Sequence, residues 1–84
     1  MPVNAYKDSP VTKEYETKAK NILKGELKRR GVTYADLSAK LSEIGVSVSE
    51  RTLNNKISNG GFTAAFFLEC LVAIGVQQLR LDLG

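Results

Sequence analysis

The stretch from Thr33 to Gly60 constrains the fold most, because it holds two helix-start signals separated by a helix-stop signal. The apolar residues that recur at helical spacing after Thr33 are Tyr34, Leu37, Leu41 and Ile44. Asp36 lies three residues after Thr33, which is the spacing of a capping box. Gly45 provides the stop, because glycine adopts the left-handed conformation without steric cost. The pattern predicts a helix between Thr33 and Gly45.

A second helix is expected after this stop. Ser47 and Ser49 are alternative caps for it, and Leu53 and Ile57 predict its buried face. Its opposite side carries Glu50, Arg51, Asn54, Asn55 and Ser58. Side chains of these kinds hydrogen-bond base edges and phosphates, so the pair of helices indicates a helix-turn-helix. The alternative is a solvated polar face; the two asparagines favour DNA contact, because asparagine is a poor helix-interior residue.

A basic helix is expected before this pair. It begins between Ser9 and Thr12, with Pro10 tolerated at its first position, and ends at Arg30 before Gly31. Its apolar stripe consists of Tyr15, Ala19, Ile22, Leu23 and Leu27. Gly25 lies inside it and indicates either a close helix crossing or a helix that forms only from about Ala19 onwards.

A fourth helix is expected after Gly60 and Gly61, with Thr63 as its cap and Gly75 as its stop. Residues 64–74 are apolar on nearly every side, which predicts a central, enclosed helix. The residues expected in the core are Phe67, Leu71 and Ile74.

The tail, residues 76–84, alternates Leu79, Leu81 and Leu83 with polar residues. This is the period of a strand, although Val76 and Leu79 also fit a short helical turn. A strand needs a partner, so the tail is expected to pair between the chains of a homodimer or to pack over the fourth helix. The predicted fold is therefore all-α, with four or five helices, a flexible arm over residues 1–11 and one domain over residues 12–84.

Composition argues against several classes of function. The 84 residues include one cysteine and no histidine, and the carboxylates are scattered, so no metal, cofactor, catalytic residue or small-molecule substrate is expected. Cys70 is expected to be a small core residue, and its isolation fits a reducing cytoplasm. Gly60 and Gly61 are not followed by the Gly-Lys-Ser or Gly-Lys-Thr of a phosphate loop. The apolar run 64–76 is too short to span a bilayer, so no membrane contact is expected.

Charge distribution leaves two function classes open. The net charge is +3, and residues 13–30 hold seven basic and three acidic side chains. Residues 31–61 hold three of each sign. The basic first helix is compatible with nucleic acid, whereas the neutral second segment favours a protein-interaction module. An RNA-binding platform is a third reading, but Tyr6, Tyr15 and Tyr34 are too dispersed to form one.

Residues from about Asn21 to Leu81 resemble the lambda-repressor-like DNA-binding domains, which include Cro and XRE-type regulators. The positions that carry the resemblance are Leu23, Leu27, Arg30-Gly31, Leu37-Ser38, Leu41, Gly45-Val46, Ser49, Leu53, Ile57, Asn59-Gly60, Leu71 and Ile74-Gly75-Val76. The chain also looks like small uncharacterised bacterial proteins that carry the segments Leu-Lys-Arg-Arg-Gly-Val-Thr-Tyr and Asn-Lys-Ile-Ser. One departure is that Ser38 lies seven residues before Gly45, where the pattern has a small residue about four before.

The resemblance implies a division of roles among the polar residues. Groove-facing positions would be held by Ser49, Glu50, Arg51, Asn54 and Asn55. Phosphates would lie beside Thr33, Tyr34, Ser58 and Asn59, where helix ends and loops present unpaired donors. The basic side chains of Lys28, Arg30 and Lys56 are also expected at phosphates, and for the lysines and arginines of the first helix, Lys24 included, a solvated face is the alternative.

The predicted function is that of a small cytoplasmic regulator of double-stranded DNA. Its third helix would enter the major groove. The protein would form a homodimer on a two-fold DNA site, with residues 76–84 as the contact between the two chains. The main rival is a protein-interaction module, antitoxin-like or accessory, that keeps the helical fold without binding DNA.

Overall fold

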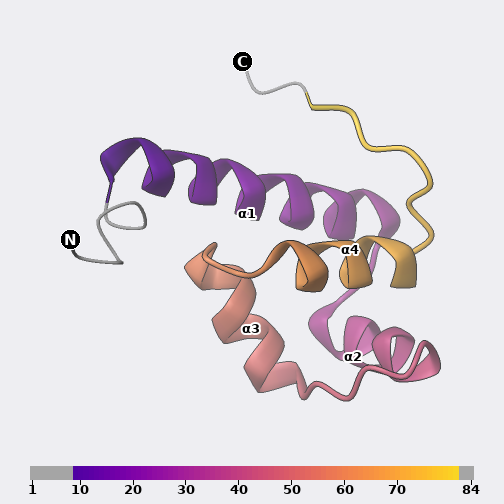
Figure 1. The fold of residues 1–84 in the computed structure, drawn as a ribbon. Coiled ribbons are helices and arrows are strands. Elements are labelled where there is room, and N and C mark those ends of the chain that lie inside the picture. The colour runs from indigo at the N-terminus through magenta and orange to yellow at the C-terminus, as the bar shows by residue number, and fades with distance from the viewer. Residues whose placement is uncertain (1–8, 82–84) are drawn as a thin grey trace.

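Four α-helices make up the computed structural model, which describes residues 9–81. They are α1 (Pro10–Arg30), α2 (Tyr34–Glu43), α3 (Glu50–Asn59) and α4 (Ala64–Ala73). The all-α class and the four helices are confirmed for this part of the chain. In Figure 1, α1 is the long helix, α4 runs directly below it, and α2 and α3 lie further below. The predicted flexible arm falls mostly on residues 1–8, which lie outside the described residues.

The core is built from pairs of residues spaced four apart, one pair on each helix. These pairs are Leu23 and Leu27, Leu37 and Leu41, Leu53 and Ile57, and Phe66 and Cys70. Residues four apart lie one above the other on a helix, so each pair forms a short apolar ridge that faces the centre. Leu71 and Ile74 complete the buried set.

Three helices end in the same way, through a repeated Leu-x-x-x-Gly-Val segment. The segments are 27–32, 41–46 and 71–76. In each, the valine N–H donates to the leucine carbonyl at 2.9 Å and the glycine has a positive φ. This is the hydrogen bond of a Schellman motif, which satisfies a carbonyl that the helix end leaves unpaired. The predicted glycine stops at residues 31, 45 and 75 are confirmed, and the shared segment gives all three helix ends the same geometry.

The glycine at which α1 and another helix approach each other closely is Gly60, at the end of α3, and not Gly25. Helix α1 runs without interruption from Pro10, and a Cβ at Gly25 would meet only the Arg29 guanidinium, at 3.8 Å. Both readings of Gly25 are therefore wrong. Gly60 has a φ of 78°, and a Cβ there would lie 2.8 Å from the carbonyl oxygen of Glu16. The end of α3 thus lies directly against the backbone of α1.

Several apolar residues lie closer to solvent than expected. Tyr15 is 54% exposed and Ile44 is 44% exposed, so neither belongs to the core. Phe66 is buried, whereas Phe67 is only partly buried and stacks on Phe62. The periodicity of a helix that is apolar all round does not show which phenylalanine points inward.

The enclosed position predicted for α4 is wrong. Leu68 is 58% exposed and Val72 is 62% exposed, so one side of this helix faces solvent. The core occupies only the opposite side, because α4 packs against α1 and α2 and no described element covers its outer side.

The predicted strand in the tail is also wrong, as far as the structure describes it. Residues 76–81 follow α4 as a chain without helix or strand. Leu79 is partly buried against the core, Leu81 is 69% exposed, and Leu83 lies outside the described residues. Among the described helices, none is both long enough and apolar enough to cross a membrane.

Candidate nucleic-acid interface

Helix α3 presents a wholly polar surface to solvent. Its cap is Ser49, whose hydroxyl accepts a hydrogen bond from the Thr52 N–H at 3.1 Å, which decides between the two predicted caps. Leu53 and Ile57 are fully buried, as predicted. Every other residue of α3 is exposed and polar or charged. The predicted base-contacting residues Ser49, Glu50, Arg51, Asn54 and Asn55 are all exposed, as are Ser58 and Asn59.

One asparagine on this surface is oriented by its own helix. The Asn54 carbonyl oxygen accepts a hydrogen bond from the Ser58 hydroxyl at 3.2 Å. Asn55, the next residue, lies about 100° further round the helix. The two asparagines therefore point in different directions, and a ligand that contacts both must surround part of the circumference of α3.

The connection from α2 to α3, residues 44–49, is longer than the three or four residues of an ordinary helix-turn-helix turn. It is tied back to α2, because the Ser38 hydroxyl donates to the Val48 carbonyl at 2.6 Å in a partly buried setting. Val46 and Val48 pack against the core. Ser38, the residue that departs from the expected pattern, therefore helps to fix where α3 begins.

The predicted capping box at the start of α2 is confirmed. The Asp36 N–H donates to the Thr33 hydroxyl, and the Thr33 N–H donates to the Asp36 carboxylate, both at 3.1 Å. Hydrogen bonding of the Thr33 backbone and side chain to the Asp36 carboxylate lowers the pKa of Asp36, because it stabilises the charged form. This carboxylate already accepts a hydrogen bond from the Thr33 amide, so it competes with any phosphate that approaches that amide.

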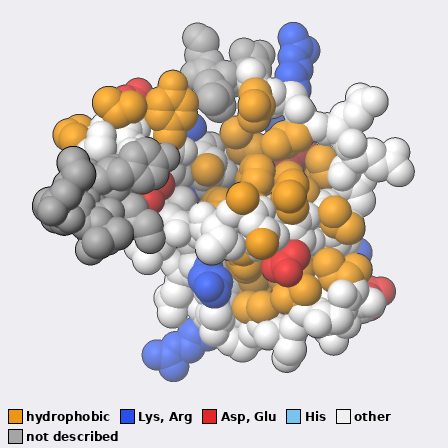
Figure 2. Space-filling view, viewed as in Figure 1, with side chains coloured by type: hydrophobic (Ala, Val, Ile, Leu, Met, Phe, Trp, Pro, Cys, Tyr) orange, Lys and Arg blue, Asp and Glu red, His pale blue; other side chains and the backbone are white. Residues whose placement is uncertain are grey.

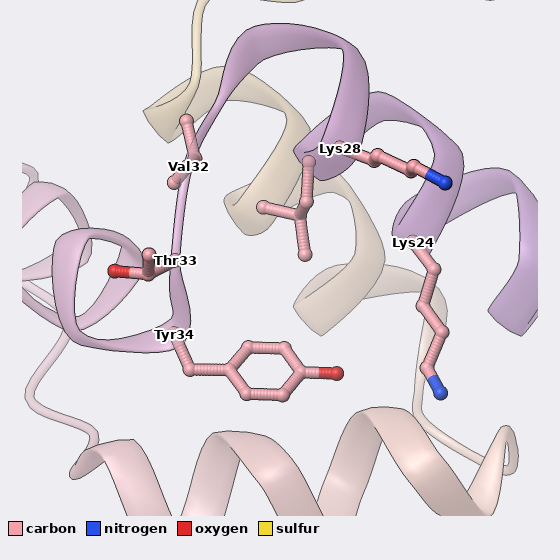
Figure 3. Close-up of a pocket in the computed structure, with 6 residues that line it drawn as sticks. Lys24, Lys28, Val32, Thr33 and Tyr34 are labelled. Carbon is pink, nitrogen blue, oxygen red and sulfur yellow. The ribbon is translucent and has the colours of Figure 1, made fainter.

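An open hollow of about 270 Å³ lies between the end of α1 and the start of α2. Its lining consists of Lys24, Leu27, Lys28, Val32, Thr33 and Tyr34. Figure 3 shows the Tyr34 ring across the hollow, with its hydroxyl on the side of Lys24. Burial raises the pKa of Tyr34, so its hydroxyl remains protonated and able to donate.

The hollow brings together three of the predicted phosphate contacts, Lys28, Thr33 and Tyr34, and adds Lys24. Lys24 lies one helical turn before Lys28, so both ammonium groups extend from the same side of α1. A basic rim beside a helix N-terminus favours an anion electrostatically. The hollow itself was not predicted; the i, i+4 spacing of the two lysines is the signal in the sequence that could have indicated it.

Arg30 and Lys56 have partners within the protein. The Arg30 guanidinium donates to the Ile74 carbonyl at 3.3 Å and pairs with Glu26, so it joins α1 to the end of α4. Glu26 also pairs with Arg29, and the two guanidinium groups lower the pKa of this carboxyl. The Lys56 ammonium lies over the Phe66 ring, 5.5 Å from its centroid. Both predicted phosphate contacts would have to leave these partners to reach a phosphate.

Cys70 is buried in the core, as expected. Burial in apolar surroundings raises its pKa to about 12, with a further contribution from the charge of Glu69. The thiol is therefore protonated at neutral pH and is a poor nucleophile, since the thiolate is the reactive form.

Comparison with known proteins gives a family and no activity. No curated protein and no solved structure matches the chain. A family model described as a domain of unknown function, DUF6471, matches residues 15–79, which cover most of α1, all of α2, α3 and α4, and the start of the tail. The expected likeness to an uncharacterised family is compatible with this match, and the chain belongs to the DUF6471 family.

Proposed function

We propose that the chain is a small DNA-binding regulator of the lambda-repressor-like, helix-turn-helix type, which inserts α3 into the major groove of double-stranded DNA. The observation that supports it most is the outward surface of α3, which is exposed and polar along its whole length. A single α-helix fits the major groove, where base edges present donors and acceptors in distinct patterns.

The side chains of α3 match this chemistry. The Arg51 guanidinium suits the two acceptors of guanine, and Asn54 and Asn55 suit the donor and acceptor of adenine. Glu50 suits the cytosine amino group. The Ser49 hydroxyl suits either kind of group once it leaves the Thr52 hydroxyl, to which it donates at 2.9 Å.

The hollow beside α2 would hold the sugar-phosphate backbone. Lys24 and Lys28 supply charge, and Thr33 and Tyr34 supply polar groups at the start of α2. Figure 3 shows the Tyr34 ring between the α1 and α3 ribbons, so a strand bound there would run beside α3. Ser58 and Asn59, at the other end of α3, would contact the phosphates beyond the groove.

The proposal is tested by a titration of the protein with random-sequence duplex DNA at two salt concentrations, followed by fluorescence anisotropy. Binding should weaken steeply as salt rises, because contacts with phosphates release counterions. Lys28→Ala should weaken binding to all duplexes alike and reduce the slope of log K against log salt by about one. Lys13→Ala, at the other end of α1, is the matched control and should bind like the wild type.

Base reading is tested separately, on duplexes selected from a random pool. Arg51→Ala or Asn55→Ala should cost about 1–3 kcal/mol on the selected sequence and much less on random DNA. An absence of binding even at low salt would reject the proposal.

The alternative is a protein-interaction module on the same helical fold. It is favoured by the neutral charge of residues 31–61 and by the apolar outer side of α4. Under this alternative the chain would bind no duplex at either salt concentration.

A homodimer is the third part of the proposal, since two copies read a two-fold site more specifically than one. The alternation of residues 76–84 suggested the tail as the contact. The described part of that tail forms no strand, which leaves the dimer contact to be sought elsewhere.

A further inference from the structure

The outer side of α4 is the largest feature that the proposed function leaves unused. Its exposed residues, Ala64, Ala65, Leu68 and Val72, are all apolar and are called the α4 face below. Figure 2 shows many hydrophobic side chains gathered over α4 and the neighbouring part of the molecule, with one acidic side chain among them. Single exposed apolar residues are ordinary, whereas a contiguous apolar patch marks an interaction site.

We propose that the α4 face binds the α4 face of a second copy of this chain, with the two helices antiparallel about a two-fold axis at Leu68. Such an axis makes the same surface meet itself, so the face must be complementary to its own image. With the axis at Leu68, the two leucines meet, and residue 64 of one copy lies opposite residue 72 of the other. A small alanine thus faces a larger valine on both sides of the central leucines, which lets the two surfaces interlock.

The charge of α4 fits a second copy better than a charged partner. Helix α4 contains no basic residue, and its one acid, Glu69, is only partly exposed. Glu69 follows Leu68 and therefore lies about 100° further round the helix, at the edge of the α4 face. Its carboxylate can stay hydrated when Leu68 is covered. The centre of the contact is therefore uncharged on both copies, and nothing on it would recognise an acidic or a basic partner.

The size of the face indicates a reversible dimer. A ten-residue helix is about 15 Å long, and stable interfaces bury about 800 Å² on each partner. Four exposed side chains on a helix of this length cover less than that, and the partly buried Phe67, next to Leu68 in the helix, adds to the apolar surface. The expected dimer therefore dissociates on dilution.

This arrangement has a consequence for α3, although the inference does not depend on DNA binding. In Figure 1, α3 extends to one side of α4, away from α1. The proposed two-fold axis lies in the interface and is perpendicular to α4, so it is parallel to the direction in which α3 extends. Rotation about the axis does not change that direction. Both copies of α3 would therefore lie on the same side of the dimer.

Sedimentation equilibrium of the full chain without DNA tests the inference. The wild type should associate to a dimer as concentration rises, and added salt should not weaken it, because the contact is apolar. Leu68→Lys should raise the dissociation constant about a hundredfold, since it places two ammonium groups at the axis. Ile44→Lys, at another exposed apolar residue, is the matched control and should dimerise like the wild type. A wild type that remains monomeric, or equal effects of both variants, would overturn the inference.

A cysteine at the axis provides a second readout. Leu68→Cys should form a disulfide-linked dimer under mild oxidation, because symmetry brings the two Cα atoms within bridging distance. Native Cys70 is buried with its pKa raised to about 12, so it should not contribute. Ile44→Cys is again the control, and equally fast cross-linking of both variants would reject the axis. If the dimer forms but random duplex DNA does not bind, DNA recognition fails and this inference stands. If DNA binds and the wild type stays monomeric, the homodimer and this inference fail and DNA recognition stands.

Discussion

Helices α3 and α4 are built alike on the inside and oppositely on the outside. Each has ten residues, a hydroxyl cap and a pair of buried apolar residues four apart. Yet every exposed residue of α3 is polar or charged, and every exposed residue of α4 is apolar. The inner pairs fix both helices to the same core. The outer faces, which contribute little to that core, are therefore where the two helices differ in what they can bind.

The two outer faces differ in how they interact with water, and this determines what each face contributes to binding. A polar outer face is hydrated when it is free, and on binding it exchanges hydrogen bonds with water for hydrogen bonds with the partner. The net change in free energy is small, so such a face provides mainly specificity. An apolar outer face is unfavourable in water until something covers it, so it provides affinity. A small domain with one face of each kind has separate surfaces for recognition and for association.

The largest expected effect comes from replacing leucines on the two sides of α4. Leu71→Ala should lower the free energy of unfolding by about 2–5 kcal/mol, because Leu71 is buried. Leu68→Ala should change it by less than about 0.5 kcal/mol in dilute protein, because Leu68 faces solvent. Urea unfolding followed by circular dichroism measures both. Equal losses would show that the outer side of α4 is covered in the monomer and would remove the contrast with α3.

A smaller effect is expected at the joint between the two helices. Gly60→Ala should cost about 2–4 kcal/mol, because the new Cβ would lie 2.8 Å from the backbone of α1 and the φ of 78° is strained for alanine. Gly45→Ala has a similar φ of 87° with nothing within 4 Å, so it should cost only about 1–2 kcal/mol. Thermal unfolding compares the two variants. Equal costs would mean that the contact with α1 does not set the position of α3 relative to α4.

The smallest effect is expected at the capping box of Thr33 and Asp36, which begins α2, the helix that precedes the polar α3. The pKa of Asp36 is lower in the folded state than its ordinary value of 3.8. Its stabilising contribution is therefore complete above that value and is lost as pH falls through the lower folded pKa. Asp36→Asn should flatten the loss of stability below about pH 4, as measured by unfolding at a series of pH values.

Glu43→Gln is the control for the capping box, because it removes a carboxylate at the other end of α2. Glu26, whose pKa is also lowered, keeps part of the pH dependence in both variants. A pH profile of Asp36→Asn identical to the wild type would show that the capping box does not contribute.

The sequence by itself determined the parts of the protein that depend on near neighbours. The capping box of Thr33 and Asp36, the glycine stops and the buried pair on α3 were all predicted correctly, because each needs only residues within about four positions. The exposure of the polar residues of α3 followed from the same periodicity.

Only the tertiary structure decided what lies opposite a given side chain. It placed Phe66 rather than Phe67 in the core, joined Arg30 to the end of α4, and left residues 76–81, the described part of the tail, without a strand. It also showed that α4 has an open side. A helix that is apolar on nearly every side carries only a weak periodic signal for direction, so its buried side is set by where α1 and α2 lie.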